Sequence, residues 1–398
     1  MAGGSPDGRR EGGRLAGRAT ATTTLKSEPP RLVRMQPRDL SDHSPYVPGR
    51  GVEEVARDRG IDPDDLIKLS SNENPHGPSP AAIEAIREHA DRVHQYPKSS
   101  HTDLTAKIAE KWGVSTEQVW VSPGADGSID YFARAALEPG DEVLVPSPGF
   151  AYYAMSARYH HGEVSEYELD AADGFAQDAE TVLSAYGGER IVYVTSPHNP
   201  SGSTMPLDEV EAIADATAEE TLVVVDEAYG EFAPVDSAIP LVDERDDVAV
   251  LRTFSKAYGL AGLRIGYGVV PEAWGEAYAK VNTPFAANEL ACRAALAALD
   301  DESHVEASVE SARWAREHIA DELDAPTVES AGNFVLAEVG DAERVAEEAQ
   351  ERGVIIRDCT SFGLPNHVRI STGTREETRE AVERLNETLA DLGLGVRA

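Results

Sequence analysis

The sequence predicts an α/β fold, with a large domain whose mostly parallel sheet is covered by helices and a smaller α+β domain. From about residue 80, short apolar runs alternate with helical periodicities. This alternation is typical of parallel strands that are buried on both faces. After residue 290 the pattern changes to long charged helices and then to further short strands.

The apolar runs of the first part are the expected strands of the large sheet. They occupy residues 119–124, 141–148, 190–197, 221–229, 248–255 and 263–270. Helix-like segments such as 126–137 and 207–220 lie between most of them. Ligands of such sheets bind at the carboxyl ends of the strands. The polar segments "SPGADGS", "SPHNPSG" and "DEAYGEF" directly follow apolar runs, so we expect the functional site there.

The other segments complete the expected domain division. Residues 1–34 are rich in small residues and arginine and lack the apolar core of a signal peptide, so we expect a disordered tail, with Met35 as an alternative start. Residues 35–75 are expected to form an N-terminal arm and part of the small domain. Residues 76–290 would form the large domain and residues 291–398 the small C-terminal domain.

The net charge of the chain is −35, which makes nucleic acid and anionic membranes unfavourable partners. Acidic excess with few lysines also matches proteins from a high-salt cytoplasm, because salt screens the self-repulsion. We therefore hypothesise that the protein is halophilic and that molar salt stabilises its fold.

No apolar run approaches the ~18 residues that span a bilayer. Cys292 and Cys359 are the only cysteines, so we expect neither a disulfide framework nor a thiolate metal site. We expect a cytoplasmic protein without a metal.

One lysine lies in a glycine-rich segment that contains no acidic residue. The chain has 7 lysines against 29 arginines, and Lys256 is the only lysine between Lys111 and Lys280. It lies in "TFSKAYGLAGLRIGYG". A lysine removed from water can attack an aldehyde through its amine, although most lysines are simply exposed. The segment favours Schiff-base chemistry, with a surface lysine as the alternative.

Two further segments would suit a pyridine-aldehyde cofactor. Asp226, at the end of an apolar run, would keep the ring nitrogen protonated. Asn199 would donate a hydrogen bond to a ring hydroxyl. Taken alone, however, Asp226 is also compatible with a helix cap or a metal ligand, and the motif of Asn199 taken alone favours a plain turn.

A phosphate site is predicted at a strand-to-helix turn. Gly124, Ala125 and Asp126 would place free amides at a helix N-terminus, where the helix dipole attracts an anion. Ser255 and Arg264 would add a hydroxyl and a guanidinium group. Many turns of this kind look similar, so this motif is weak in isolation.

Together, these segments resemble the class I/II aminotransferases, which are fold type I pyridoxal-phosphate enzymes. The pattern S-K-x-x-G-L-x-G-x-R is met from Ser255 to Arg264, and Asn199, Asp226 and Lys256 follow the family's order and spacing. Within this family the chain is similar to the histidinol-phosphate aminotransferases, from about residue 38 to 392. The segments that carry this similarity are "LSSNENPHGPSP", "QYPK", "DEAYGEF", "FSKAYGLAGLRIGY" and "VRISTGT".

The resemblance implies how the ring of pyridoxal 5'-phosphate would be held. Lys256 would bond to the aldehyde and then carry the α-proton of the substrate. Asp226 would pair with the pyridinium nitrogen, and Asn199 and Tyr229 would bond the ring 3'-oxygen. Phe150 would stack on the ring. Lys256, Asp226 and Tyr229 would be the catalytic residues.

The resemblance also implies contacts to the cofactor phosphate. Ala125, Asp126, Ser255 and Arg264 would surround it. Tyr96 would reach the phosphate of a neighbouring subunit, which implies a homodimer.

For the substrate, the resemblance implies contacts to Arg369 and Asn74. Tyr46 and Arg357 are further candidates near the substrate phosphate or imidazole. Tyr46 is also compatible with loop packing, and both arginines with ion pairs on a charged domain.

The expected reaction is transamination between histidinol phosphate and 2-oxoglutarate, giving imidazole-acetol phosphate and glutamate, or the reverse. An aromatic or broad-specificity aminotransferase and a threonine-phosphate decarboxylase share the same anchor residues. His76 and His198 depart from the usual motif residues and leave the substrate open. A regulator without catalysis usually has an attached DNA-binding domain, which neither the glycine-rich segment 1–34 nor the anionic body suggests. A nicotinamide dehydrogenase would need a G-x-G-x-x-G turn, which is also absent.

Overall fold

The computed structural model describes residues 35, 38–98 and 101–394. The predicted tail, residues 1–34, lies outside the described residues, so its disorder stays a prediction. The chain divides into two units, residues 1–42 and 43–398, and every helix and strand below belongs to the second unit.

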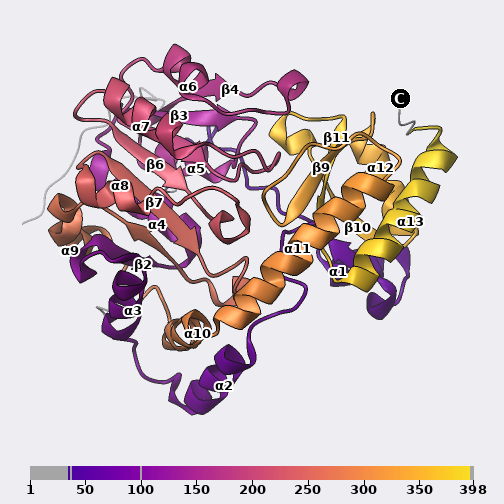
Figure 1. Cartoon of the computed structure of the whole chain (residues 1–398), viewed down its shortest axis with the longest axis horizontal. Helices are drawn as coiled ribbons and strands as arrows, with labels where there is room; N and C mark the ends of the chain where they lie inside the picture. Colours follow the sequence, from indigo (N-terminus) through magenta and orange to yellow (C-terminus); the bar gives the residue numbers. More distant parts are fainter. Residues whose placement is uncertain (1–34, 36–37, 99–100, 395–398) are drawn as a thin grey trace, which may run out of the picture. The chain divides into compact units, whose positions relative to one another are not determined.

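A sheet in the order β2-β8-β7-β6-β5-β3-β4 forms the centre of the larger part (Figure 1). Its strands are β2 (Val119–Ser122), β3 (Glu142–Ser147), β4 (Glu163–Glu168), β5 (Ile191–Thr195), β6 (Leu222–Asp226), β7 (Val248–Thr253) and β8 (Gly266–Val269). The five strands β4, β3, β5, β6 and β7, which are adjacent in this order, are parallel to one another. Strand β8 runs antiparallel to both of its neighbours, β7 and β2. The predicted mostly parallel α/β sheet is confirmed.

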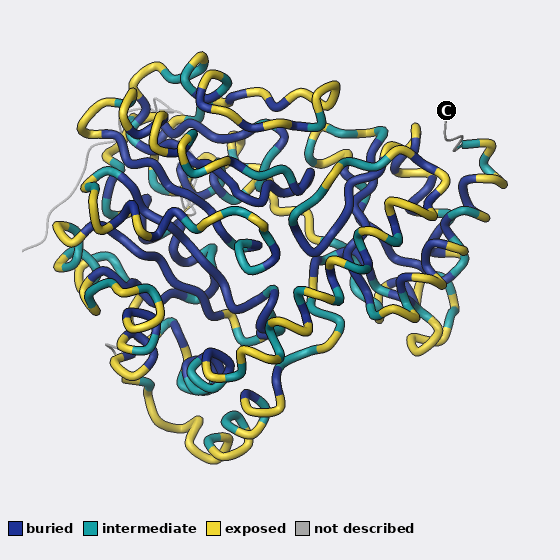
Figure 2. Tube along the Cα trace, viewed as in Figure 1, coloured by how far each residue is buried: buried dark blue, intermediate teal, exposed yellow. Residues whose placement is uncertain are grey.

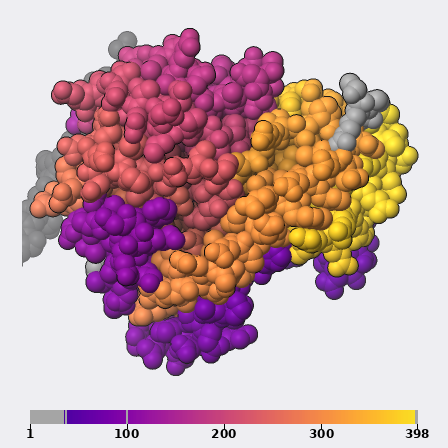
Figure 3. All heavy atoms as spheres, viewed as in Figure 1, coloured from indigo at the N-terminus to yellow at the C-terminus, as the bar shows by residue number. Residues whose placement is uncertain are grey.

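Helices occur throughout the described chain. They are α1 (Val52–Arg59), α2 (Pro80–His89), α3 (Thr102–Trp112), α4 (Gly124–Ala136), α5 (Tyr152–Tyr159), α6 (Ala179–Ala185), α7 (Leu207–Ala216), α8 (Ile239–Glu244), α9 (Tyr278–Val281), α10 (Glu289–Leu299), α11 (Glu302–Glu322), α12 (Ala342–Glu351) and α13 (Arg375–Leu392). Segments distant in sequence meet among them. The purple surface of α2 lies against the orange surface of α10 in Figure 3.

Both faces of the large sheet are covered, and the two-residue period of the strands divides their side chains between two cores. Ile191 and Tyr193 of β5 pack with α4 and α5, whereas Val192 and Val194 pack with α3, α6, α7 and α8. The central strands are therefore buried along their length, as Figure 2 shows. Burial on both faces explains why these strands read as continuous apolar runs.

Strand β4 was not predicted. Its sequence, "EVSEYE", is rich in glutamate, and it lies at the edge of the sheet beside β3 alone. Only Tyr167 is buried in it. An edge strand tolerates charged side chains because one of its sides faces solvent, and charge also discourages pairing with other chains.

The second sheet has the order β1-β10-β11-β9. Its strands are β1 (Ile67–Leu69), β9 (Phe334–Glu338), β10 (Val354–Asp358) and β11 (His367–Ser371). Helices α11, α12 and α13 contribute to its apolar core. Strand β1 comes from the N-terminal part and pairs in parallel with β10. The boundaries proposed at residues 75 and 290 stay predictions.

Two features bear on the environment of the protein. None of the described helices combines the length and the apolar character needed to cross a membrane. Cys292 and Cys359 are both buried and free. Burial raises the pKa of both thiols, to about 12 for Cys292 and about 11 for Cys359.

Candidate active site

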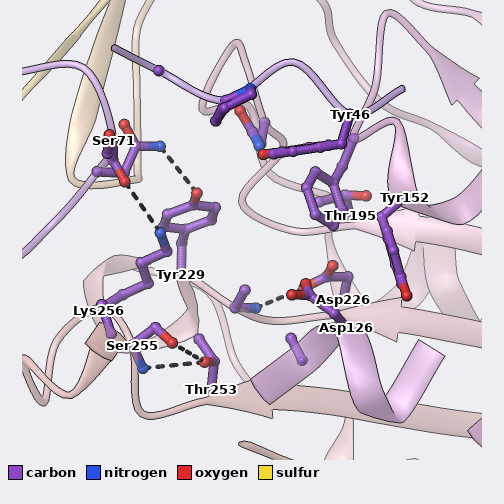
Figure 4. A pocket seen from close by; sticks show the side chains of 18 of the residues that line it. Tyr46, Ser71, Asp126, Tyr152, Thr195, Asp226, Tyr229, Thr253, Ser255 and Lys256 are labelled. Atoms are coloured by element: carbon purple, nitrogen blue, oxygen red, sulfur yellow. Dashed lines mark hydrogen bonds between the residues drawn. The ribbon is translucent and has the colours of Figure 1, made fainter. Parts of the chain in front are cut away.

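All the predicted site residues except Gly124, Asn74 and Tyr96 line one cavity of ≈ 470 Å³. Figure 4 shows part of this lining. Thr195, Asp226 and Thr253 enter it from the carboxyl ends of the neighbouring parallel strands β5, β6 and β7. The smaller sheet supplies two arginines, one from β10 and one from β11. The cavity therefore lies where the topology of a parallel sheet favours a ligand.

Asp226 is the buried acidic group of this cavity, with 4% of its surface exposed. The hydroxyl of Tyr153 donates to its Oδ2 at 2.5 Å, and the amide of Ala228 donates to its Oδ1 at 2.9 Å. Burial nevertheless raises the pKa of Asp226 to about 6. A carboxyl group in this setting can pair with a protonated ring nitrogen.

Lys256 lies at another side of the cavity, near Tyr229 (Figure 4). Its Nζ is 3.5 Å from the carbonyl oxygen of Ser71 and 5.5 Å from the centre of the Tyr229 ring. In the described part of the chain, no carboxylate forms a salt bridge with this amine. The amine is thus available for chemistry in the cavity.

The hydroxyl of Tyr229 is fixed by a neighbouring amide. Nδ2 of Asn72 donates to it at 3.0 Å, and Asn72 is held in turn by hydrogen bonds with the hydroxyl of Ser371. Because the Tyr229 oxygen accepts from Asn72, its own proton remains free to be donated to a ligand.

One end of the cavity is suited to an anion. Helix α4 begins at Gly124, which has a φ of +81°, and a Cβ there would lie 2.5 Å from a guanidinium nitrogen of Arg264. Only glycine allows this close approach. Arg264, itself at a φ of +54°, donates to Asp126 at 2.7 Å and to Ser255 at 3.3 Å. The first amides of α4, with Ala125, complete the set of donors.

Arg369 supplies a second cationic group. Its guanidinium donates to Oδ1 of Asn199 and, at 3.2 Å, to the carbonyl of Ser70. Its Nε is buried without a hydrogen-bond partner among the described residues, where no carboxylate pairs with it either. A buried, incompletely bonded guanidinium is suited to bind a carboxylate or phosphate.

Arg357 and Tyr46 lie in the same part of the lining. Arg357 donates to the carbonyl of Val47 at 2.7 Å and to Ser361 at 2.9 Å. Burial and the nearby charge of Arg369 lower the pKa of Arg357. An anion placed between these arginines would relieve their repulsion.

Two predicted site residues lie elsewhere. Asn74 donates to the carbonyl of Ala257 and to Ser308, so its amide fixes the loop rather than facing the cavity. Tyr96 is 83% exposed and stacks on Phe285, with ring centres 4.7 Å apart. Their predicted roles stay predictions.

The two histidines that left the substrate open do not line the cavity. His198 is fully buried and bonds to Ser201 and to the carbonyl of Pro148, and burial lowers its pKa to about 4. His76 is exposed. Neither position therefore alters the shape of the cavity directly.

Several lining residues were missed by sequence reasoning. Asn72 lies in the same motif as Asn74, and Tyr153 lies in the same motif as Phe150. Thr195 ends a strand that was predicted correctly. The motifs indicated segments that line the cavity, but which side chain of a segment faces the cavity depends on the tertiary packing.

The geometry agrees with the comparison to known protein families. The family model described as aminotransferase class I and II matches residues 64–385. The chain belongs to this family. The match covers most of the chain and contains almost all of the residues that line the cavity.

Related proteins narrow the position of this aminotransferase within the family. It is 93% identical over 364 residues to the histidinol-phosphate aminotransferase of Halorubrum lacusprofundi, covering 92% of this chain and 100% of the relative. It is 65% identical over 358 residues to that of Haloferax volcanii, covering 90% and 99%. The resemblance to the histidinol-phosphate aminotransferases is thereby confirmed.

The fold also matches solved structures. The histidinol-phosphate aminotransferase of Sinorhizobium meliloti, solved in complex with pyridoxal-5'-phosphate, superposes with a TM-score of 0.80 at 29% identity, covering 88% of this chain and 96% of that chain. The aspartate aminotransferase of Thermus thermophilus with maleate gives 0.76 at 27%, covering 89% and 100%. Two enzymes with different substrates thus share this scaffold.

Proposed function

We propose that this chain is a pyridoxal-phosphate-dependent aminotransferase that exchanges the amino group of histidinol phosphate with 2-oxoglutarate in histidine biosynthesis. One observation carries this proposal. The amine of Lys256, which has no carboxylate partner among the described residues, and the buried carboxyl group of Asp226 line one cavity together with separate cationic groups for two anions. The names of its close relatives support the choice of substrate.

The donors and acceptors of the cavity fit the ring of pyridoxal phosphate. Asp226 offers a buried carboxylate to the ring nitrogen. Asn199 uses its Oδ1 for Arg369, which leaves its Nδ2 for the ring oxygen, and Tyr229 can donate its hydroxyl proton to the same oxygen. Phe150 provides an aromatic face.

The anion-binding end fits the phosphate group of the cofactor. Ser255, Arg264 and the first amides of α4 at Ala125 would donate to it. Asp126 already pairs with Arg264, so its carboxylate would orient the guanidinium while its amide faces the phosphate.

When bound, pyridoxal phosphate supplies an electron sink for the negative charge that develops at the α-carbon of the substrate. Lys256 would remove the α-proton of the substrate with its Nζ. It would then deliver a proton to the former aldehyde carbon of the cofactor, which becomes the carbon that bears the amine. Asp226 would keep the ring nitrogen protonated through charge pairing. Tyr229, beside the amine, would hold the ring oxygen during both half-reactions.

The two arginines of the smaller sheet would orient the substrates. Arg369 would take the carboxylate of glutamate, because its planar guanidinium can bind two oxygens at once. Arg357 and Tyr46 would contact the phosphate or imidazole of histidinol phosphate. Asn74 would act on the substrate only through the loop that it fixes.

The function is tested by steady-state kinetics of the cofactor-loaded protein in molar salt. We expect kcat/KM for L-histidinol phosphate with 2-oxoglutarate to exceed that for L-tyrosine by roughly 10² or more. The reason is that the phosphate of histidinol phosphate would meet a cationic group of the cavity, whereas tyrosine has no phosphate. Equal values for both would indicate a broad aromatic aminotransferase. Release of CO₂ from L-threonine phosphate would indicate a decarboxylase instead.

We further propose a cytoplasmic homodimer in which Tyr96 reaches the neighbouring subunit. The exposure of Tyr96 and Phe285 supports this, since large exposed aromatic side chains are common at protein interfaces. The two free cysteines are compatible with a reducing compartment.

We expect Tyr96→Phe to weaken the affinity for pyridoxal phosphate roughly tenfold while the dimer persists, because one hydrogen bond to a charged group is lost. Light scattering and cofactor titration measure the two quantities. Tyr159→Phe, at another partly exposed tyrosine, should change neither. A monomeric wild type would refute the shared site.

A further inference from the structure

Tyr153 contacts two residues of the cavity lining, Phe150 and Asp226, and no role was predicted for it. It lies in α5, only 1% exposed, and its ring stacks on Tyr193 with centres 4.4 Å apart and planes 14° apart. Its ring also stands edge-on to Phe150, with centres 5.5 Å apart and planes 86° apart. The side chain therefore has one well-defined position, fixed by two aromatic contacts.

The hydroxyl of Tyr153 is placed between two strand ends. It lies 2.9 Å from Oγ1 of Thr195 and 2.5 Å from Oδ2 of Asp226. Thr195 and Asp226 are register partners at the ends of β5 and β6. Because the ionised carboxylate can only accept, Thr195 donates to Tyr153 and Tyr153 donates to Asp226. Consecutive hydrogen bonds polarise one another, so the bond from Thr195 strengthens the bond from Tyr153 to Asp226.

The surroundings of Asp226 otherwise oppose its negative charge. Burial is the largest effect, and the acidic side chains of Asp126 and Glu227 act in the same direction. Two hydrogen bonds favour the charged form, the one from the hydroxyl of Tyr153 and the one from the amide of Ala228. A side-chain substitution leaves the backbone amide in place, so Tyr153 is the side-chain donor through which mutation can test the stabilisation of this carboxylate.

We propose that Tyr153 is a positioning residue that keeps Asp226 ionised and directed into the cavity, where it meets the ring nitrogen of the cofactor. The inference rests on the proposed function for its catalytic consequence, but not for the state of Asp226 itself. Tyr153 also contacts Phe150. One rigid side chain would therefore position both the aromatic ring that stacks on the cofactor and the carboxylate that pairs with the cofactor's ring nitrogen.

Tyr153→Phe removes one oxygen atom and retains the stacked ring. In the cofactor-free protein, we expect the midpoint of the Asp226 titration to rise from about 6 by about one pH unit or more, since a donor to the charged form is lost. The ionised fraction at pH 7 would fall from about nine-tenths to about half. Difference infrared spectroscopy follows this carboxyl group, and Asp226→Asn identifies its band.

In the cofactor-loaded protein, we expect Tyr153→Phe to lower kcat about tenfold with little change in the KM of either substrate, because the defect lies at the cofactor ring. The matched control is Tyr193→Phe. Tyr193 is equally buried and stacked, but the donors to Asp226 in the described structure are Tyr153 and Ala228. This control should leave both the titration midpoint and kcat near their wild-type values.

The two arms separate the possible failures. A wild type that does not load pyridoxal phosphate overturns the proposed function, while the infrared titration still tests the tyrosine. An unchanged midpoint in a folded Tyr153→Phe protein overturns the inference, as does an equal shift in Tyr193→Phe. Should Tyr153→Phe fail to fold, Thr195→Val keeps the tyrosine and removes its donor, and a midpoint that stays at the wild-type value overturns the inference.

Discussion

Replacing Lys256 by alanine should lower kcat for transamination by on the order of 10⁴-fold or more. The amine is needed twice, as the nucleophile toward the aldehyde and as the group that moves the α-proton, and a single general base already contributes about 10²–10⁴-fold. The substitution removes little that holds the fold, because the hydrogen bond from Nζ to the carbonyl of Ser71 is long, at 3.5 Å. Protein folding should therefore be preserved.

Absorbance spectroscopy distinguishes the loss of chemistry from the loss of the cofactor. The wild type should show a visible band from the lysine–aldehyde bond, whereas Lys256→Ala should bind pyridoxal phosphate without that band. Lys280→Ala, at an exposed lysine of α9, is the matched control and should behave as wild type. A Lys256→Ala protein with wild-type spectrum and turnover would assign the chemistry to another amine.

The large sheet could be predicted from sequence because its strands are buried on both faces. Their apolar runs contain the strand ends that carry Asp226 and the turn before α4. Strand β4 could not be recognised, because an edge strand with one buried side chain among glutamates has no distinctive pattern. The short β1 strand is defined by its pairing with β10, which lies nearly 300 residues away, so local sequence did not reveal it.

The site was predictable to the level of motifs and less so to the level of side chains. Lys256, Asp226 and Arg369 were predicted because each belongs to a recognisable segment, and each lines the cavity, while their roles stay predictions. Asn72 and Asn74 are two residues apart, and only the folded loop decides that the first faces Tyr229. Tyr153 was missed because its role depends on the packing of α5 against two strand ends.

Arg252→Ala should lower the free energy of unfolding by about 3–5 kcal/mol, which is the usual cost of breaking a buried ion pair from one side. Arg252 is 5% exposed, and it donates to Glu227 at 2.6 Å and to Glu231 at 2.9 Å. It also lies over the ring of Trp112, 4.6 Å from its centre. Without the guanidinium, two largely buried carboxylates lose their only cation among the described residues.

The same change should weaken catalysis, because these carboxylates shape the turn after β6. Gly230 lies against the guanidinium, and a Cβ there would be 2.7 Å from it. Asp226 precedes Glu227 directly, and Tyr229 lies between the two paired glutamates. The ion pairs of Arg252 with the two glutamates thus help to hold the turn that carries Asp226 and Tyr229, which line the cavity.

Urea unfolding in molar salt measures the effect, with Arg313→Ala as the control. Arg313 pairs with Glu310 on the surface, where such a pair contributes about 0–1 kcal/mol. Burial already raises the pKa of Glu231, so in Arg252→Ala this carboxyl group should protonate more readily than an exposed one. Protonation removes the buried charge. The loss in free energy of unfolding caused by Arg252→Ala should therefore shrink as the pH falls and grow as the pH rises. A deficit no larger than that of Arg313→Ala at neutral pH would mean that water reaches these glutamates, and that the turn bearing Asp226 and Tyr229 is held by its backbone alone.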